Sequence, residues 1–514
     1  MRPHPFMVLP LMFIGEFAGM LCGVARDLVI VNMVCQEGGF AAGTSCDAQE
    51  VVEAAAGFQL LFTVAGAVPA FFASVPLGTF ADRAGRGAVI ALSNAGKLLF
   101  LIGMLAVQWG GLRKEWLLPS AVLAGMAGST PTIIAGCLGF VVDVGAVETR
   151  SRDFVLVDTM LKLGLVLGSA AGGWLVQEGC PCLKNALAGS ACSTCTLPFV
   201  VPAVLTALVV ALALCWLPDS LAYRKARRQE AGAEPLLSIA DGSHRKGSAE
   251  PEHRRPGGDL CGGQLLSVAT ATPLLLLRTL RASRGHFVVI LGFACCMGGF
   301  FGFKDSAIDY FKQRFQMDSE QYGMFLSSES GWKVGWQVVF SVAATRSLCL
   351  RALCISPDEA GDAADDRARN LLLVQWCGVS AAVAYAAYVA TPIFDAVFAF
   401  AALDGAGGLA APLLRRTISG LTSDDRQGEV LAMFASIETV CQLSAGVVYN
   451  GLFELTSGFF PEAFGCLAAL SELGCAACAR AFASSGKARA GYRAPLGARA
   501  CDALCFAESV RAVK

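Results

Sequence analysis

Apolar runs of about 20 residues, the length that a helix needs to cross the hydrocarbon core of a bilayer, recur along most of this 514-residue chain. Only 16% of the residues are charged, and the mean hydropathy is +0.57. A soluble domain of this size carries roughly a quarter charged residues. These features exclude a water-soluble globular protein and predict an all-α membrane protein that crosses the bilayer many times.

The apolar runs predict twelve spans in two groups of six. The first group lies near residues 5–33, 52–77, 88–110, 116–142, 154–177 and 197–217. The second group lies near residues 286–310, 322–344, 370–390, 392–414, 428–455 and 458–483. The predicted domains are an N-terminal half over 1–217, a flexible linker over 218–285, a C-terminal half over 286–483 and a tail over 484–514. The linker is rich in Gly, Pro, Ser and charge, which does not support a packed core.

The distribution of lysine and arginine predicts the orientation, because cytoplasmic loops retain positive charge during insertion. Thirty of the 40 basic residues fall on the side that holds both termini and the linker, 5 fall on the other side, and 5 fall inside spans. Both termini, the linker and the tail are therefore predicted to be cytoplasmic. The near balance of 40 basic and 41 acidic residues gives no reason to expect a nucleic-acid partner.

Six of the 21 cysteines fall in predicted outer loops, at Cys35, Cys46, Cys180, Cys182, Cys192 and Cys195. Their even number favours disulfides on an oxidising face. Free thiols and a zinc site built from the CPC and CSTC spacings are the alternatives. Most other cysteines lie inside spans, where we expect them to pack as small apolar side chains. We predict no bound metal and no cofactor.

The loop between the second and third spans carries a specific motif, GTFADRAGRG. It resembles the signature loop G-x-x-x-D-R-x-G-R-[RK] of the major facilitator superfamily. The matching residues are Gly78, Asp82, Arg83, Gly85 and Arg86. Gly87 stands where the superfamily usually has a second basic residue. The resemblance implies two pseudo-symmetric halves of six helices each and a function in transport.

Other stretches agree with this resemblance in order along the chain. The region after the fourth predicted span resembles the corresponding loop of the superfamily, through Asp143, Glu148 and Arg150. The stretch GLVLGSAAGGW resembles its antiporter motif through Gly164, Gly168, Gly172 and Gly173, although Ser169 replaces the proline. Parts of the second half resemble the branch with fungal and tetracycline-efflux-like carriers and the proton-coupled folate transporter group.

The resemblance implies that the signature loop is a cytoplasmic gate, and elementary electrostatics explains how. A helix that begins near Gly428 presents unpaired backbone N–H groups and a partial positive charge, and Asp82 is the candidate carboxylate to receive them. The candidates for ion pairs around it are Arg83, Arg86, Asp143 and Glu148. The glycine series predicts that the fifth span approaches a neighbouring helix closely. Two interpretations of this approach stay open, pure packing and a conformational role.

Ionisable side chains inside spans are costly and by default face a cavity or a partner. Asp158 with Lys162 and Glu329 with Lys333 have the i, i+4 spacing of local ion pairs, so we expect them to neutralise each other. The remaining candidates for substrate or proton sites are Glu16, Lys97, Lys304, Asp305, Asp404 and Glu438.

The resemblance implies that the first, fourth, seventh and tenth spans line a central cavity, which favours three of these candidates. They are Glu16, Asp305 and Asp404. A carboxyl group beside a mobile lysine can load and release a proton as its access alternates. Glu16 is the first choice for this role and Asp404 the second.

These observations predict a monomeric secondary transporter in the lipid bilayer that moves a small organic solute with protons. The alternatives are a uniporter and a carrier-like sensor or scaffold that does not transport. A membrane enzyme is disfavoured because the four histidines lie in no span interior and at no metal-ligand spacing. The sequence has no G-x-x-x-x-G-K-[ST] loop, which disfavours an ATP-driven pump.

Overall fold

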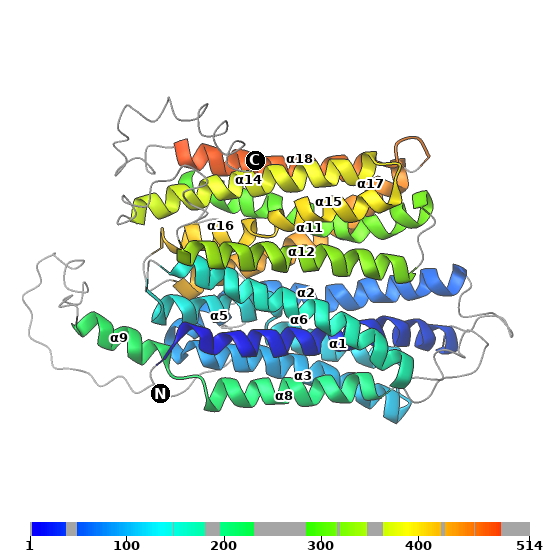
Figure 1. Ribbon diagram of the computed structural model, residues 1–514. Coiled ribbons are helices and arrows are strands. Elements are labelled where there is room, and N and C mark those ends of the chain that lie inside the picture. The colour runs from blue at the N-terminus through cyan, green and yellow to red at the C-terminus, as the bar shows by residue number, and fades with distance from the viewer. Residues whose placement is uncertain are drawn as a thin grey trace, which may run out of the picture.

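The computed structural model describes the chain in stretches separated by short gaps. These are residues 3–37, 49–146, 149–179, 196–230, 284–315, 319–346, 363–422, 427–456 and 458–484. Within these stretches every regular element is a helix (Figure 1). The expected all-α class is therefore confirmed.

The first half of the chain forms one group of long helices. It contains η1 (Pro5–Met7), α1 (Val8–Glu37), α2 (Gln49–Ala84), α3 (Arg86–Gly110), η2 (Lys114–Trp116), α4 (Leu117–Met126), α5 (Thr130–Val144), α6 (Arg150–Gly179) and α8 (Leu197–Cys215). The chain then enters α9 (Ser220–Glu230). Figure 1 shows the long helices of this half running side by side, below those of the second half.

The second half forms the other group. It contains α11 (Arg284–Phe315), α12 (Ser319–Arg346), α14 (Ala363–Ala390), α15 (Phe394–Gly407), α16 (Ala410–Ser419), α17 (Gln427–Thr456) and α18 (Ala463–Ser484). The two groups interlock, because Leu431 and Ala435 of α17 belong to the apolar core of the first half and Val155 of α6 belongs to that of the second.

Eleven helical segments of the described chain are long and apolar enough to cross a membrane. They correspond to eleven of the twelve predicted spans. The remaining predicted span, 322–344, lies in α12, which is helical but more polar, since Glu329, Lys333 and Gln337 interrupt its apolar residues. The protein is thus a multi-pass membrane protein, and the count of twelve spans stays a prediction.

Two predicted spans are interrupted helices rather than continuous ones. Between α4 and α5 the chain turns at Gly128, whose φ of +98° suits glycine, and Pro131 begins the next helix. Between α15 and α16 the break falls at Gly408 and Leu409. In each case the glycine-rich and proline-containing sequence weakens the helix there. The two breaks occupy corresponding spans of the two halves.

The prediction of a flexible linker over 218–285 is wrong for its first residues. Ser220–Glu230 form α9, which packs against α5. Its side chains Ser220 and Arg224 both bind the buried carboxylate of Asp143. Charge-assisted hydrogen bonds to a buried acid order a segment whose composition alone supports no core. Residues 231–283 of the linker and 485–514 of the tail lie outside the described residues.

Candidate functional site

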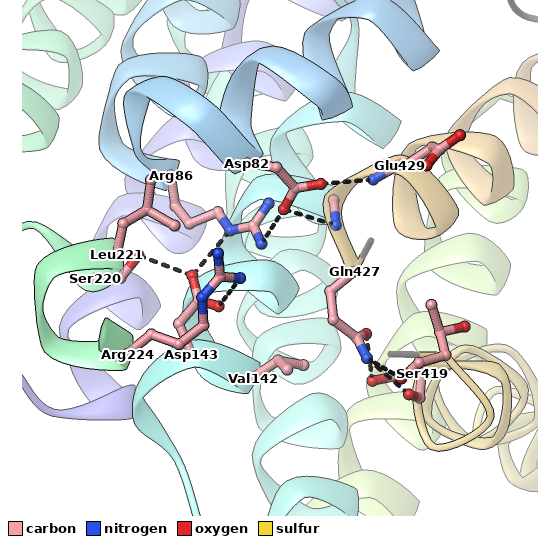
Figure 2. A network of polar contacts seen from close by, with 12 residues as sticks. Asp82, Arg86, Val142, Asp143, Ser220, Leu221, Arg224, Ser419, Gln427 and Glu429 are labelled. Carbon is pink, nitrogen blue, oxygen red and sulfur yellow. Dashed lines mark hydrogen bonds and ion pairs between the residues drawn. The ribbon is translucent and has the colours of Figure 1, made fainter. Parts of the chain in front are cut away.

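The first candidate site joins the end of α2 to the start of α17. The backbone N–H groups of Gly428 and Glu429 donate to the two carboxylate oxygens of Asp82, each at 3.2 Å (Figure 2). These N–H groups have no partner within α17 because they lie in its first turn. The negative charge of Asp82 also offsets the positive end of the helix dipole. Asp82 thus lies where the signature loop predicted a carboxylate.

Arg86 ties the same carboxylate to the end of α5. Its guanidinium lies 2.6 Å from Asp82 Oδ1, and its Nε donates to Asp143 Oδ2 at 3.0 Å. Asp143 also accepts from Ser220 Oγ at 2.9 Å and Arg224 Nη1 at 3.2 Å. Figure 2 shows these side chains converging from α2, α3, α5, α9 and α17. We call this cluster, Asp82, Arg86, Asp143, Gly428 and Glu429, the latch.

Glycines allow the backbones of the latch to meet. A Cβ on Gly78 would lie 2.4 Å from Ala432 Cβ and 2.5 Å from the carbonyl oxygen of Gly428. A Cβ on Gly428 would lie 2.3 Å from Arg86 Nη1. Gly85, between α2 and α3, has a φ of +103°, which other residues rarely adopt. The glycines of the motif are therefore required by geometry.

The start of α17 is held in place by the neighbouring helix. The side-chain amide of the buried Gln427 donates to the carbonyl oxygens of Ser419 at 2.8 Å and Thr422 at 2.9 Å, and Ser419 Oγ donates back to Gln427 Oε1 at 2.9 Å (Figure 2). Gln427 thereby joins the end of α16 to the first turn of α17. No sequence motif had pointed to this residue.

Two predicted members of the gate, Arg83 and Arg150, lie outside the latch, and a third, Glu148, is not among the described residues. Arg83 is exposed. Arg150 is buried at the start of α6, where its Nη2 donates to the carbonyl oxygen of Val142 at 3.2 Å. Of the predicted ion pairs, the structure therefore contains the one between Arg86 and Asp143.

The glycine series of the fifth predicted span packs α6 against α1. Cβ atoms on Gly164, Gly168 and Gly172 would approach the carbonyl oxygens of Phe13, Phe17 and Leu21 to 2.8, 2.6 and 2.8 Å. A Cβ on Gly173 would meet nothing within 4 Å. Three of the four glycines thus permit close helix packing, and the fourth does not contribute to it.

The second candidate site is a cavity of about 380 Å³ between the two halves. Residues of α1, α5 and α6 line one side, and residues of α11, α12, α14 to α18 line the other. The break between α4 and α5 contributes Ser129 and Thr130, and the break between α15 and α16 contributes Gly407 and Gly408. Interrupted helices that border a cavity are a recurring feature of transporter binding sites.

Glu16 of α1 lines this cavity in a paired state. Its Oε1 lies 2.7 Å from Lys97 Nζ of α3 and accepts from Thr130 Oγ1 at 3.2 Å. Two residues that the sequence singled out separately, Glu16 and Lys97, are therefore partners.

Asp158 and Lys162 of α6 form the expected ion pair, and both also contact the other half. Gln337 of α12 donates to Asp158 Oδ2 at 2.6 Å, and Lys162 Nζ donates to the carbonyl oxygen of Gly408 at 3.2 Å. Gln337 donates to that same oxygen, also at 3.2 Å. At the break between α15 and α16, the carbonyl oxygen of Gly408 thus accepts hydrogen bonds from two side chains. The pair does more than neutralise itself, because it helps to join the halves.

Glu329 and Lys333 of α12 also form their expected ion pair. Lys333 Nζ lies 2.9 Å from Asp404 Oδ2 of α15 and 4.4 Å from the ring centroid of Phe300. One buried cation therefore faces two buried carboxylates. The sequence placed Asp404 inside a span but did not reveal its partner.

The remaining candidates lie on α11 and α17. Lys304 and Glu438 line the cavity, and Glu438 pairs with Arg415 of α16. The side chain of Asp305 lies outside the described residues. Arg415, which follows the predicted span 392–414, is buried, 5.1 Å from the ring centroid of Phe293. Glu472 of α18, which also lines the cavity, was missed, although an isolated acid inside an apolar run was the available signal.

The cysteine predictions are tested at one position. Cys35, at the end of α1, is disulfide-bonded, in agreement with the preferred interpretation of the outer-loop cysteines. The other five, Cys46, Cys180, Cys182, Cys192 and Cys195, lie outside the described residues.

Comparison with known proteins places this geometry in a family. A family model described as Major Facilitator Superfamily matches residues 17–345. The chain is 28% identical over 182 residues to the proton-coupled folate transporter of Bos taurus. This region is 33% of the chain and 39% of that protein, so the chain spans about two fifths of the relative's length.

Two solved structures share the architecture over almost the whole chain. The human organic anion transporter MFSD10 (TETRAN) is 16% identical, with a TM-score of 0.65 over 93% of this chain and 100% of that one. The proton:xylose symporter XylE is 12% identical, with a TM-score of 0.57 over 92% of this chain and 94% of that one. At these identities the likeness shows the fold.

Proposed function

Because the chain belongs to the major facilitator superfamily, a family of transporters, we propose that it is a secondary active transporter that moves a small organic solute by alternating access, coupled to protons. The observation that carries this proposal is the cavity of about 380 Å³ that both halves line. The latch supports it, since it holds α2 of one half to α17 of the other at one end of the spans.

In this proposal the two halves, residues 1–217 and 286–483, rock against each other about the solute. The contacts that change are those between the halves: the latch, and the contacts of Asp158 and Lys162 with Gln337 and Gly408. These polar contacts lie beside the apolar packing in which Leu431 and Ala435 of α17 join the core of the first half. Each polar contact contributes about 0.5–3 kcal/mol, and solute binding can offset part of the cost of breaking it.

We place the coupling proton on the pair Asp404 and Glu329. Lys333 carries one positive charge and contacts both carboxylates, so these three side chains together carry a net charge of −1. An uncompensated buried charge is costly, and one shared proton would remove it. Glu16 has a cation and a hydroxyl of its own, so we rank it second.

The cavity offers a solute charged groups of both signs, since five acidic side chains line it, namely Glu16, Asp158, Asp404, Glu438 and Glu472. Four basic side chains also line it, namely Lys162, Lys304, Lys333 and Arg415. Such groups bind carboxylates well, because both partners are charged and form hydrogen bonds. The bovine relative is named as a proton-coupled folate transporter and the human structural neighbour as an organic anion transporter. Folate and related organic anions are therefore the first solutes to test.

We further propose that both termini lie in the cytoplasm and that the monomer is the transporting unit. The excess of basic residues on the latch side supports the orientation. The enclosure of the cavity by two halves of one chain supports the monomer.

Two experiments test the function. Purified protein is first screened by thermal shift against organic anions at mildly acidic and neutral pH, because a ligand of the native state raises the unfolding temperature. Hits are then tested as radiolabelled solutes in proteoliposomes with and without an inward proton gradient. Uptake that the gradient drives above equilibrium supports the proposal. Gradient-independent equilibration indicates a uniporter, and binding without flux indicates a sensor.

Neutralising variants test the site of the proton. Asp404→Asn removes one of the two charges that face Lys333, so we expect uptake to continue without its response to the proton gradient. Glu16→Gln is the comparison, and it should keep that response while it weakens the contact with Lys97. The reverse pattern would move the proton to Glu16. A gradient response in both variants would remove both assignments.

A further inference from the structure

Three side chains of types that can bind a metal ion lie close together between α11 and α18. The Sγ atoms of Cys296 and Cys475 and a carboxylate oxygen of Glu472 all lie within 4.8 Å of one another. Glu472 and Cys475 are three residues apart on α18 and so share one face of that helix, and Cys296 comes from α11. All three are buried, and both cysteines are free thiols.

Glu472 is the unusual member of this cluster. It is 2% exposed, and its Oε2 accepts no hydrogen bond from any residue that the structure describes. Buried carboxylates are normally paired, because an unpaired one carries a large desolvation cost. Lys333 does not fill this role, since it contacts Glu329 and Asp404. Gly299 leaves the space beside the carboxylate open, as a Cβ there would lie 3.2 Å from Glu472 Oε1.

We propose that Cys296, Glu472 and Cys475 bind a transition-metal ion of the zinc class, with its fourth coordination position facing the central cavity. Two thiolates and one carboxylate suit Zn²⁺ and related ions, whereas Mg²⁺ and Ca²⁺ prefer oxygen ligands alone. Cys296 and Glu472 both line the cavity, so water or a donor atom of the solute can complete a tetrahedral site.

A metal ion would give the buried carboxylate of Glu472 a partner without changing the net charge of the site. Binding releases the two thiol protons, and the ion then faces three negative charges, one of them the carboxylate whose Oε2 accepts no hydrogen bond from the described residues. The cysteines inside spans thus include two with a role beyond packing. The site is separate from the latch and from the ion pairs on which the transport proposal depends.

Neighbouring cysteines provide matched controls. Cys478 lies three residues beyond Cys475 on α18, and Cys295 precedes Cys296 on α11, yet neither belongs to the cluster. Cys478 is half-buried, so a serine there is easily accommodated. The variant Cys478→Ser therefore removes one thiol from the same region without removing a proposed ligand.

The test is a Co²⁺ titration of the full-length, metal-stripped protein in detergent under reducing conditions. Co²⁺ substitutes for Zn²⁺ and gives thiolate-to-metal absorption in the near ultraviolet. The wild type and Cys478→Ser should show this absorption with one Co²⁺ per chain, and Zn²⁺ should abolish it. Cys296→Ser and Cys475→Ser should lose it. Glu472→Gln should bind Co²⁺ at least tenfold more weakly.

Equal absorption in the wild type and in Cys296→Ser or Cys475→Ser would overturn the proposal, as would its absence from the wild type. If a variant is not monodisperse, the site is tested in the wild type instead. Its cysteines are labelled with a maleimide and the labelled positions are identified by mass spectrometry. Zn²⁺ should protect Cys296 and Cys475 but not Cys478, and equal labelling with and without Zn²⁺ overturns the site. This readout requires no solute flux, so its failure leaves the transport proposal intact.

Discussion

Asp82 performs two tasks with one carboxylate. It receives two N–H groups from the first turn of α17, and it lies 2.6 Å from the guanidinium of Arg86. The first task joins the two halves of the protein, and the second joins α2 to α3 and, through Arg86, to Asp143 of α5. Under the transport proposal, a side chain with these contacts stabilises the state in which the latch is formed.

We expect Asp82→Asn to lower transport while leaving expression unchanged. The amide keeps one acceptor oxygen but loses the charge that offsets the helix dipole and pairs with Arg86, a loss of about 1–2 kcal/mol. A loss of this size changes the balance of the two states about five- to thirtyfold. Initial uptake rates in proteoliposomes measure the effect.

Arg83→Gln is the matched control for Asp82→Asn, because Arg83 is an exposed charge of the same motif. It should transport at the wild-type rate. Unchanged uptake in Asp82→Asn would show that the latch does not govern transport. An equal loss of uptake in both variants would indicate that the charge of the loop, and not the contact of Asp82 with α17, governs transport.

At the scale of the helices, glycine spacing decides how closely two backbones approach. Gly78 meets Gly428 where α2 crosses α17, and Gly164, Gly168 and Gly172 repeat every four residues where α6 packs on α1. The first contact joins the two halves, whereas the second lies within one half. Substitutions at the two places should therefore have different consequences.

Gly78→Ala should impair transport more than stability. Its Cβ would lie 2.5 Å from the carbonyl oxygen of Gly428, so α2 and α17 must separate and the hydrogen bonds to Asp82 must lengthen. The cost falls on the state in which the latch is closed. Uptake in proteoliposomes and the unfolding temperature are measured together. Gly57→Ala, also on α2 but with nothing within 4 Å, should change neither.

Gly168→Ala should destabilise the folded protein. Its Cβ would lie 2.6 Å from the carbonyl oxygen of Phe17 in the middle of a long helix contact, and such overpacking costs about 1–3 kcal/mol. The midpoint of thermal unfolding in detergent should fall. Gly173→Ala has open space around its Cβ and should leave the midpoint unchanged or raise it. Equal midpoints for the two variants would contradict this packing role.

At the scale of the whole molecule, the two halves are joined by polar contacts at two levels. The latch is one level, and the contacts of Gln337 with Asp158 and Gly408 at the cavity are the other. Solute that enters the cavity meets the second level directly, since Asp158 and Gly408 line it. Binding and rearrangement of the halves can therefore be linked at these side chains.

We expect Gln337→Ala to weaken the link between the halves at the cavity. Asp158 would lose a hydrogen bond of 2.6 Å in a buried setting, which costs about 1–3 kcal/mol. The unfolding temperature should fall, and the affinity for solute, measured by thermal shift, should change. Thr159→Val removes only a bond to the carbonyl of Val155 within α6 and should preserve affinity. The same affinity in both variants would exclude a role for Gln337 in solute binding.

Much of the architecture follows from the sequence because its cause is local. The all-α class follows from the length and polarity of the apolar runs, since a bilayer leaves few other ways to satisfy backbone hydrogen bonds. The signature loop identified Asp82 and its helix partner near Gly428, because a motif of fixed spacing forms its turn locally. The two i, i+4 ion pairs are equally local.

The partners across helices were decided only by the tertiary structure. Glu16 with Lys97, Lys333 with Asp404 and Asp158 with Gln337 are separated by 81, 71 and 179 positions. The sequence determined where along its span each of these side chains lies, since that position follows from the limits of the apolar run. It did not determine which side chain each one faces, because rotation about a helix axis and choice of neighbour depend on how all the helices pack together.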